Sequence, residues 1–229
     1  MSKIRVMSAG AVEGPVTELA PAFTKAKGIE VDLNFNTVGA LKARVEGGEK
    51  TDVIILSIPA IDAVEKQGLV VSGSRTDLGL ATCGVAVRDG MMMPNIATVD
   101  GFKRMLKFAV SIAANDPAHG GSSGIYLADL LKRMGLSDEV SPKLNLYKTG
   151  RECALALVRG EAEIGITFTS EFIAVPGTRV VGALPQEIAY VNGYAGAMAT
   201  DAAPEPARAF LSFLSEPESR ACFQRYGLG

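Results

Sequence analysis

A glycine- and serine-rich loop carries the residues best suited to chemistry. Residues 120–124 read GGSSG, and they follow an apolar strand pattern and lead into a helix pattern. The N–H groups of a first helical turn have no partners within the helix, so with the Ser122 and Ser123 hydroxyls they suit an anion. The loop has neither GxGxxG spacing nor the lysine of a Walker sequence, so a nucleotide is not implied. A plain turn with a capping serine is the alternative interpretation.

Arg151 is a second candidate, at the start of a predicted helix after a Thr-Gly turn. A cation in that position opposes the helix dipole, which favours negative charge. The placement is tolerable if the guanidinium binds an anionic ligand, because arginine pairs with carboxylates through two parallel hydrogen bonds. The alternative is a surface arginine paired with Glu152 or Glu161.

His119 is the only histidine and lies in the same glycine-rich region. Histidine changes charge near neutral pH, so this side chain suits a general base, and a solvated loop residue is the alternative. Cys83, Cys153 and Cys222 are far apart and form no CxxC pair, which predicts packed thiols rather than a disulfide or zinc site. We expect no metal and no cofactor.

The composition excludes several classes of protein. Of the 229 residues, 48% are hydrophobic and 21% charged, which predicts a globular chain of one or two domains. The net charge of −2 gives no basic field for nucleic acid. With 6% aromatic residues and no tryptophan, stacking sites are not expected. The apolar runs are far shorter than the ~20 residues of a membrane span, so the chain is not expected to be membrane-embedded.

The amino-terminal residues run directly into a strand pattern, with no apolar signal region before it. We therefore expect a cytoplasmic protein if Met1 is the native start, and a periplasmic one if a leader has been removed.

The first part of the chain alternates strand and helix patterns. Strands are expected at residues 3–7, 29–35 and 52–56, each followed by a helix, with stops at Gly28, Gly47-Gly48 and Gly68. This order predicts an α/β domain with a parallel sheet. Ligands of such sheets bind beyond the carboxyl ends of the strands, here at residues 8–11, 36–39 and 57–59.

The second part repeats the same alternation with additional long strands. The strands are expected at 78–87, 110–114, 144–147, 163–168 and 190–198, and the helices at 99–107, 125–134, 152–159 and 206–213. Two similar halves joined by long strands suggest two lobes around a cleft. We expect lobe 1 to hold residues 1–81 plus 196–229, and lobe 2 to hold residues 82–195.

Segments spread over nearly the whole chain carry a family resemblance. They are Phe35, 41–48 (LKARVEGG), 51–53 (TDV), 116–117 (DP), 123–126 (SGIY), 154–158 (ALALV), 165–168 (GITF) and 223–227 (FQRYG). The chain resembles the molybdate-binding-protein-like group of type II periplasmic solute-binding proteins, which serve ABC importers. The resemblance implies an α/β, two-lobe fold with mixed, mostly parallel sheets and a ligand cleft between the lobes.

The resemblance also implies a set of ligand-binding positions. They fall on Ser8, Gly10, Ala11, Asn36, Thr37, Ser122, Ser123, Arg151, Phe168 and Thr169. The family's ligand serine is replaced by Ala11, its small apolar residue by Arg151 and its usual tyrosine by Phe168. An arginine with fewer hydroxyls suits a carboxylate better than molybdate.

Three functions follow from this set of residues. The first is a binding protein for a small anion, an organic carboxylate, with an ABC permease as partner if the protein is exported. The alternative is a cofactor-free isomerase or tautomerase of an unsaturated di- or tricarboxylate, similar to the aconitate isomerases that resemble this group, with His119 as base. The third is a receptor for molybdate or tungstate.

Overall fold

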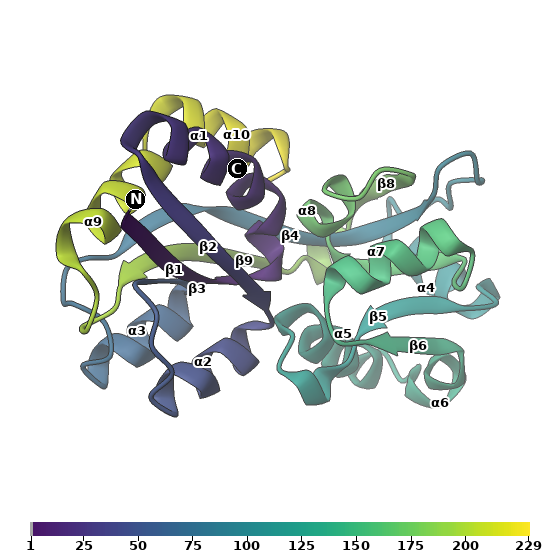
Figure 1. Cartoon of the computed structure of the whole chain (residues 1–229). Helices are drawn as coiled ribbons and strands as arrows, with labels where there is room; N and C mark the ends of the chain where they lie inside the picture. Colours follow the sequence, from purple (N-terminus) through teal and green to yellow (C-terminus); the bar gives the residue numbers. More distant parts are fainter. Residues whose placement is uncertain (1) are drawn as a thin grey trace. The chain divides into compact units, whose positions relative to one another are not determined.

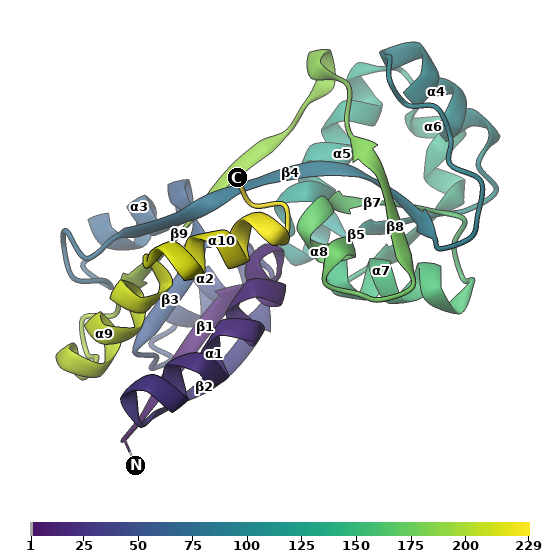
Figure 2. The same ribbon diagram turned by 90° about the horizontal axis from the view of Figure 1, so that it is seen from above.

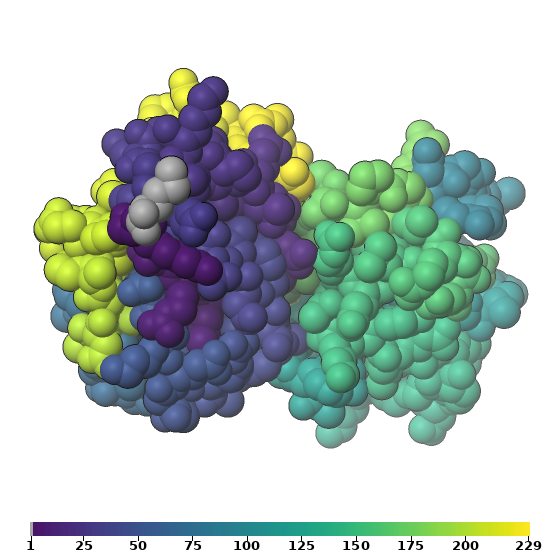
Figure 3. Space-filling model, in the orientation of Figure 1, coloured from purple at the N-terminus to yellow at the C-terminus, as the bar shows by residue number. Residues whose placement is uncertain are grey.

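The computed structural model describes residues 2–229, and they form two compact units (Figure 1). The first unit holds the chain up to Ala81 together with Asn192–Gly229, and the second holds Thr82–Val191. The chain leaves the first unit within strand β4 (Thr76–Arg88) and returns at strand β9 (Val191–Met198). Figure 3 shows residues from both ends of the chain, coloured purple and yellow, on the surface of the first unit.

The first unit is a sheet covered by helices on both faces. Its strands are β1 (Ser2–Ala9), β2 (Ile29–Asn36) and β3 (Val53–Ser57), with β9 antiparallel to β3, in the order β2-β1-β3-β9. Its helices are α1 (Glu13–Lys27), α2 (Val38–Glu46), α3 (Ile58–Lys66), α9 (Pro204–Leu214), α10 (Pro217–Arg225) and the short 3-10 helix η1 (Gly10–Val12). Figure 1 shows α1, α9 and α10 on one face and α2 and α3 on the other, and Figure 2 agrees.

Packing on both faces explains the sequence of the central strand. All five residues of β3 are buried, because helices cover both sides of it. On one face Ile54 and Leu56 belong to a cluster with Leu41 of α2 and Ile61 of α3. Each such side chain contributes about 1.5–3 kcal/mol when fully buried, so this core holds the strand ends in place.

The second unit has the same layered construction around its own sheet. Its strands are β5 (Ile112–Asn115), β6 (Leu144–Tyr147), β7 (Ile164–Phe168) and β8 (Thr178–Ala183), ordered β4-β7-β5-β6 with β8 paired to β4. Its helices are α4 (Val99–Phe108), α5 (Ser122–Arg133), α6 (Ser137–Val140), α7 (Gly150–Arg159) and α8 (Thr169–Ile173), with the 3-10 helices η2 (Pro117–His119), η3 (Ser141–Lys143) and η4 (Gln186–Ile188).

The strands and helices predicted from the sequence are confirmed, with shifts of a few residues at their ends. Helix α5 begins at Ser122 rather than at residue 125, and α7 begins at Gly150 rather than at residue 152. Candidate residues expected in loops therefore lie in first helical turns. The sequence-based prediction also missed α8, β8 and α10.

All three cysteines are free and buried, as the sequence predicted. No helix among the described residues is both long and apolar enough to cross a membrane. Within residues 2–229 no group of three or more histidine, cysteine, aspartate or glutamate side chains has an arrangement that could hold a metal ion.

Candidate anion-binding site

Three parallel strands of the first unit bring their carboxyl ends to one edge of the sheet. Ser8 of β1 lies opposite Phe35 of β2 and Ile55 of β3, and Ala9 lies opposite Asn36. The loops that follow these strands are therefore neighbours, and this is the edge at which open α/β sheets bind ligands.

The first of these loops offers backbone rather than side-chain donors. Ser8 is fully buried, and its hydroxyl donates to the carbonyl of its neighbour Ala9 at 3.4 Å. Gly10 and buried Ala11 form the short helix η1, which leads into α1. Ser8 is thus turned inward, and the loop presents the N–H groups of a helix start.

The second loop is ordered by its own polar side chains. Asn36 Oδ1 accepts from the backbone N–H of Thr37 at 2.8 Å. The Thr37 hydroxyl oxygen accepts from the N–H of Ala40 at 3.2 Å and so caps helix α2. These two bonds fix the conformation of residues 36–38 at the sheet edge.

The second unit repeats this arrangement. β5 runs parallel to β6 and to β7, with Ile112 opposite both Leu144 and Ile164. The strands end at Asn115, Tyr147 and Phe168, and helices α5, α7 and α8 begin shortly after these ends. Three helix starts, each with N–H groups lacking helical partners, therefore lie along one edge.

The close approach of Asn115 explains why glycine stands at two positions around the start of α5. A side chain on Gly121 would come within 2.9 Å of Asn115 Nδ2, and one on Gly124 would overlap the Asn115 backbone carbonyl. Asn115 is buried and also accepts a hydrogen bond from the Cys153 thiol at 3.5 Å. The glycines thus let the start of α5 pack directly on the end of β5.

The two serines of this turn differ in their surroundings. Ser123 is 2% exposed, and its Oγ lies 2.9 Å from Thr167 Oγ1 at the end of β7. Ser122 is partly exposed and hydrogen-bonds the hydroxyl of Tyr190. The two adjacent hydroxyls therefore have different partners, Thr167 at the end of β7 for Ser123 and Tyr190 for Ser122.

A stack of aromatic side chains lies beside Ser122. The ring centroids of Tyr126 and Tyr190 are 4.4 Å apart and the two rings are nearly parallel, and the Phe168 centroid lies 5.9 Å from that of Tyr190. Burial raises the pKa of Tyr190, the nearby Cys83 adds to this effect, and the bond with Ser122 opposes it. The fold thus brings together three aromatic residues that are distant in sequence.

Arg151 is exposed in the first turn of α7. The acidic residues first considered as its partners make other bonds: Glu152 forms a capping box with Thr149, and Glu161 pairs with Arg159 at 2.6 Å. The guanidinium belongs to the first turn of α7, where the N–H groups and the positive charge both favour an anion.

His119 is exposed at the end of η2, and its Nδ1 lies 3.0 Å from Asp116 Oδ2. Asp116 also accepts from the N–H of Ala118 at 2.9 Å, so the carboxylate is held in place. A carboxylate at Nδ1 favours the tautomer that carries its hydrogen on this nitrogen, and it orients the ring. Sequence reasoning missed Asp116 as the partner of His119, although the spacing of three residues could have indicated it.

Glu171 is the second group that sequence reasoning missed. Its side chain is buried in α8 and accepts a hydrogen bond from the Thr167 hydroxyl. A side chain on Gly150 would overlap the Glu171 carboxylate, so this carboxylate packs against the first residue of α7. Phe168 and Thr169, which lie between Thr167 and Glu171, are also buried.

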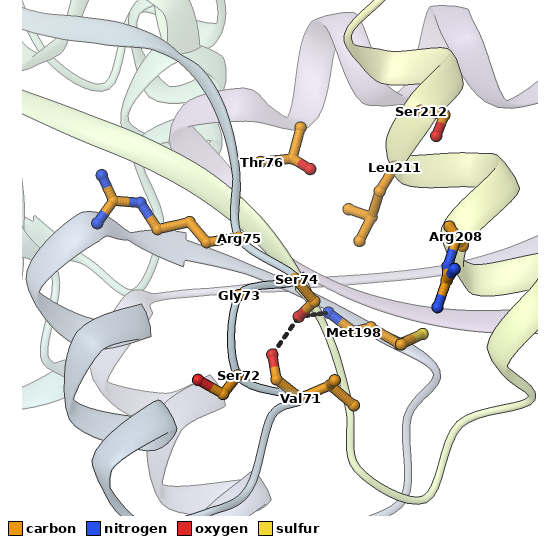
Figure 4. Close-up of a pocket in the computed structure, with 10 residues that line it drawn as sticks. All are labelled: Val71, Ser72, Gly73, Ser74, Arg75, Thr76, Met198, Arg208, Leu211 and Ser212. Carbon is orange, nitrogen blue, oxygen red and sulfur yellow. Dashed lines mark hydrogen bonds between the residues drawn. The ribbon is translucent and has the colours of Figure 1, made fainter.

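A separate cavity of about 390 Å³ lies in the first unit (Figure 4). Its lining includes Ser74, Met198 and Arg208, and Ser74 bonds the backbone of Met198 at 3.1 Å. Met198 pairs with Val53, the first residue of β3, so this cavity lies at the amino end of that strand. It is therefore at the edge opposite the candidate loops.

Comparison with known proteins gives consistent results. The family model for bacterial extracellular solute-binding proteins matches residues 4–229. An aconitate isomerase of Pseudomonas sp. is 33% identical over 235 residues, which cover 100% of this chain and 88% of that protein. The molybdate-binding protein ModA of Escherichia coli K12 is 30% identical over 229 residues, which cover 98% of this chain and 88% of that protein.

Among solved structures, the periplasmic molybdate-binding protein of Azotobacter vinelandii superposes with a TM-score of 0.81 at 18% identity, covering 99% of this chain and 98% of that chain. This likeness confirms the predicted fold class, an α/β periplasmic-binding-protein fold with mixed, mostly parallel sheets. The family match over nearly the whole sequence and the identities of 33% and 30% with two relatives agree with it. The chain therefore belongs to the family of bacterial extracellular solute-binding proteins, in its ModA-like branch.

Proposed function

We propose that this protein binds a small organic carboxylate at the helix starts of its second unit. The observation that carries the proposal is Arg151 in the first turn of α7, on an edge where α5 and α8 also begin. Backbone N–H groups hold the anionic oxygens, and the guanidinium adds paired, charge-assisted hydrogen bonds whose planar geometry matches a carboxylate. Gly10, Ala11, Asn36 and Thr37 of the first unit are the second proposed set of contacts.

Family membership implies a small solute as ligand and an ABC transporter as partner. We propose that the protein acts in the periplasm and delivers its carboxylate to an ABC permease. Ala11 and Phe168 lack the hydroxyls that the resemblance places at these positions, which supports a carboxylate over molybdate. The similarity to ModA supports a competing proposal, in which the ligand is molybdate or tungstate.

The second candidate function is an isomerase of an unsaturated carboxylate. The relative named aconitate isomerase and the His119–Asp116 pair favour it. In such a reaction His119 Nε2 removes a proton from a carbon next to the double bond. The electron pair shifts the double bond, and the proton returns at the far carbon, so that no cofactor is consumed. Arg151 would hold a carboxylate of the substrate during this shift.

A thermal-shift panel tests the ligand class. It compares citrate, both aconitate isomers, malate, succinate and maleate with molybdate, tungstate, sulfate and phosphate. A ligand at 100 times its Kd stabilises by about 2.7 kcal/mol, which for a chain of this size is a rise in Tm of several degrees. We expect rises with carboxylates. Rises with molybdate and tungstate alone would contradict the proposal.

Incubation of each carboxylate hit with the protein separates receptor from isomerase. A receptor returns the carboxylate unchanged, whereas an isomerase converts one aconitate isomer into the other, detected by chromatography. If conversion occurs, His119→Ala should abolish it while binding remains. Conversion that survives this substitution would exclude His119 as the base.

A further inference from the structure

A buried chain of three hydrogen-bonding side chains lies beneath the start of α5. Glu171 is 6% exposed, Thr167 is fully buried and Ser123 is 2% exposed. Thr167 donates to the Glu171 carboxylate, and Ser123 Oγ lies 2.9 Å from Thr167 Oγ1. The chain thus joins the first turn of α5, the end of β7 and helix α8.

The directions of these hydrogen bonds follow from simple counting. A carboxylate accepts hydrogen bonds and donates none, and a hydroxyl has one hydrogen. Thr167 uses its hydrogen on Glu171, so Ser123 must give its own hydrogen to Thr167. The Ser123 oxygen is then left with lone pairs alone for any further partner.

The position of Glu171 beside a helix start indicates that it carries the negative charge. Its carboxylate packs against Gly150 at the start of α7, where the helix dipole favours an anion. Because ionised Glu171 can only accept, Thr167 donates to Glu171 and Ser123 donates to Thr167.

We propose that Glu171 is a positioning residue that makes Ser123 a hydrogen-bond acceptor and so selects ligands that bring their own donor. The proposal rests on the proposed function and narrows its ligand class. An anion held by the N–H groups of α5 meets the Ser123 oxygen favourably only if it carries a hydroxyl. Hydroxycarboxylates and protonated oxyanions are then preferred over carboxylates without a hydroxyl and over fully deprotonated oxyanions.

Calorimetric titration with two matched ligand pairs tests this selection. Malate and succinate differ by one hydroxyl, and at pH 7 phosphate carries a hydroxyl that sulfate lacks. For the unsubstituted protein we expect malate to bind at least tenfold more tightly than succinate, and phosphate at least tenfold more tightly than sulfate.

Thr167→Val is the decisive variant because valine has nearly the shape of threonine and cannot accept a hydrogen bond. It releases the Ser123 hydrogen, so both preferences should fall at least tenfold. Thr167→Ser keeps the hydrogen-bond chain and is the matched control. Glu171→Gln should act like Thr167→Val, because its amide can donate to Thr167 and reverse the chain.

If Thr167→Val does not fold, Glu171→Gln carries the same test, because it reverses the hydrogen-bond chain and should weaken both preferences. Unchanged preferences in whichever of these variants folds would overturn the role of Glu171, as would equal binding within both pairs by the unsubstituted protein. Failure of every carboxylate in the thermal-shift panel to bind the unsubstituted protein would instead contradict the proposed function. The two failures are therefore distinguishable.

Discussion

Single side chains at the candidate site have their hydrogen bonds directed by neighbours within the same unit. Thr37 caps α2, Asp116 hydrogen-bonds His119 Nδ1, and Thr167 hydrogen-bonds Ser123. Residue type alone therefore does not decide whether a hydroxyl or an imidazole donates or accepts. The residue that hydrogen-bonds this group on the side away from the ligand decides whether it donates or accepts.

Thr37 combines a cap with a proposed ligand contact, and its two roles can be separated. Loss of a threonine N-cap costs about 1 kcal/mol, so Thr37→Val should lower Tm by roughly 2–4 °C without ligand. Thr37→Ser keeps the capping oxygen and should leave Tm nearly unchanged. Differential scanning calorimetry measures both, and an unaffected Tm in the valine variant would show that the cap adds no stability.

At the scale of helices and strands, the site depends on close approach between helix starts and strand ends. Gly124 allows α5 to touch the end of β5, and Gly150 allows α7 to touch the Glu171 carboxylate. Both helices can therefore aim their first N–H groups at the sheet edge. A larger residue at either glycine pushes a helix start away from its neighbour.

Gly150→Ala should be destabilising for this reason. Overpacking in a buried position costs about 1–3 kcal/mol, which lowers Tm by at least about 2 °C. Gly182→Ala is the matched control, since the added methyl group would meet only Ile96 Cδ1 at an ordinary 3.9 Å. Thermal unfolding of both variants checks this, and equal Tm values would show that Glu171 moves aside without cost.

Secondary-structure elements differed in how well the sequence predicted them. The alternation of residues 29–35 and the apolar run of residues 53–56 indicated strands, and Gly28 marked a helix end through its positive φ of 68°. Helix α8 has five residues, too few for a helical period to show. Helix α10 buries little beyond Ser219, Cys222 and Phe223, so its apolar pattern is weak.

Candidate site residues were easier to find than their partners. Ser123, Arg151 and His119 could be picked out because each lies in or beside a glycine turn. Glu171 and Tyr190 could not, because their importance comes from contacts with Thr167 and Tyr126 that only the folded unit creates. A glutamate just after a buried strand is the one local signal that could have indicated the first of these.

The molecule as a whole consists of two units with the same plan, a mostly parallel sheet whose strands end beneath helix starts. The order of the elements repeats, so each unit offers backbone donors at one sheet edge. Each unit also has its own hydrophobic core. The buried thiols Cys83 and Cys153 lie in the second unit.

Burial of Cys83 makes the stability of the protein fall at alkaline pH. Its pKa in the folded chain is about 12, against an ordinary value of 9.0, because burial disfavours the thiolate. The unfolded chain releases the proton first, so the stabilising contribution is complete below pH 9 and is lost as the pH rises toward 12. Tyr190, whose pKa is also raised, acts in the same direction.

We therefore expect Tm to fall between pH 8.5 and pH 10.5, and to fall less steeply in a Cys83→Ala variant. Scanning calorimetry across this range provides the measurement. A Tm that holds constant or rises across the range would contradict the account, as would equal slopes for the two proteins.

The central claim is that Arg151 holds a carboxylate, and calorimetric titration of Arg151→Gln tests it most directly. The titrant is the carboxylate that gives the largest thermal shift with the unsubstituted protein. Hydrogen bonds to charged groups contribute about 1.5–3 kcal/mol, so the affinity should fall at least about tenfold. Arg159→Gln, at the other end of α7, should bind within twofold of the unsubstituted protein. An unchanged Kd for Arg151→Gln, or no binding of any carboxylate to the unsubstituted protein, would contradict the claim.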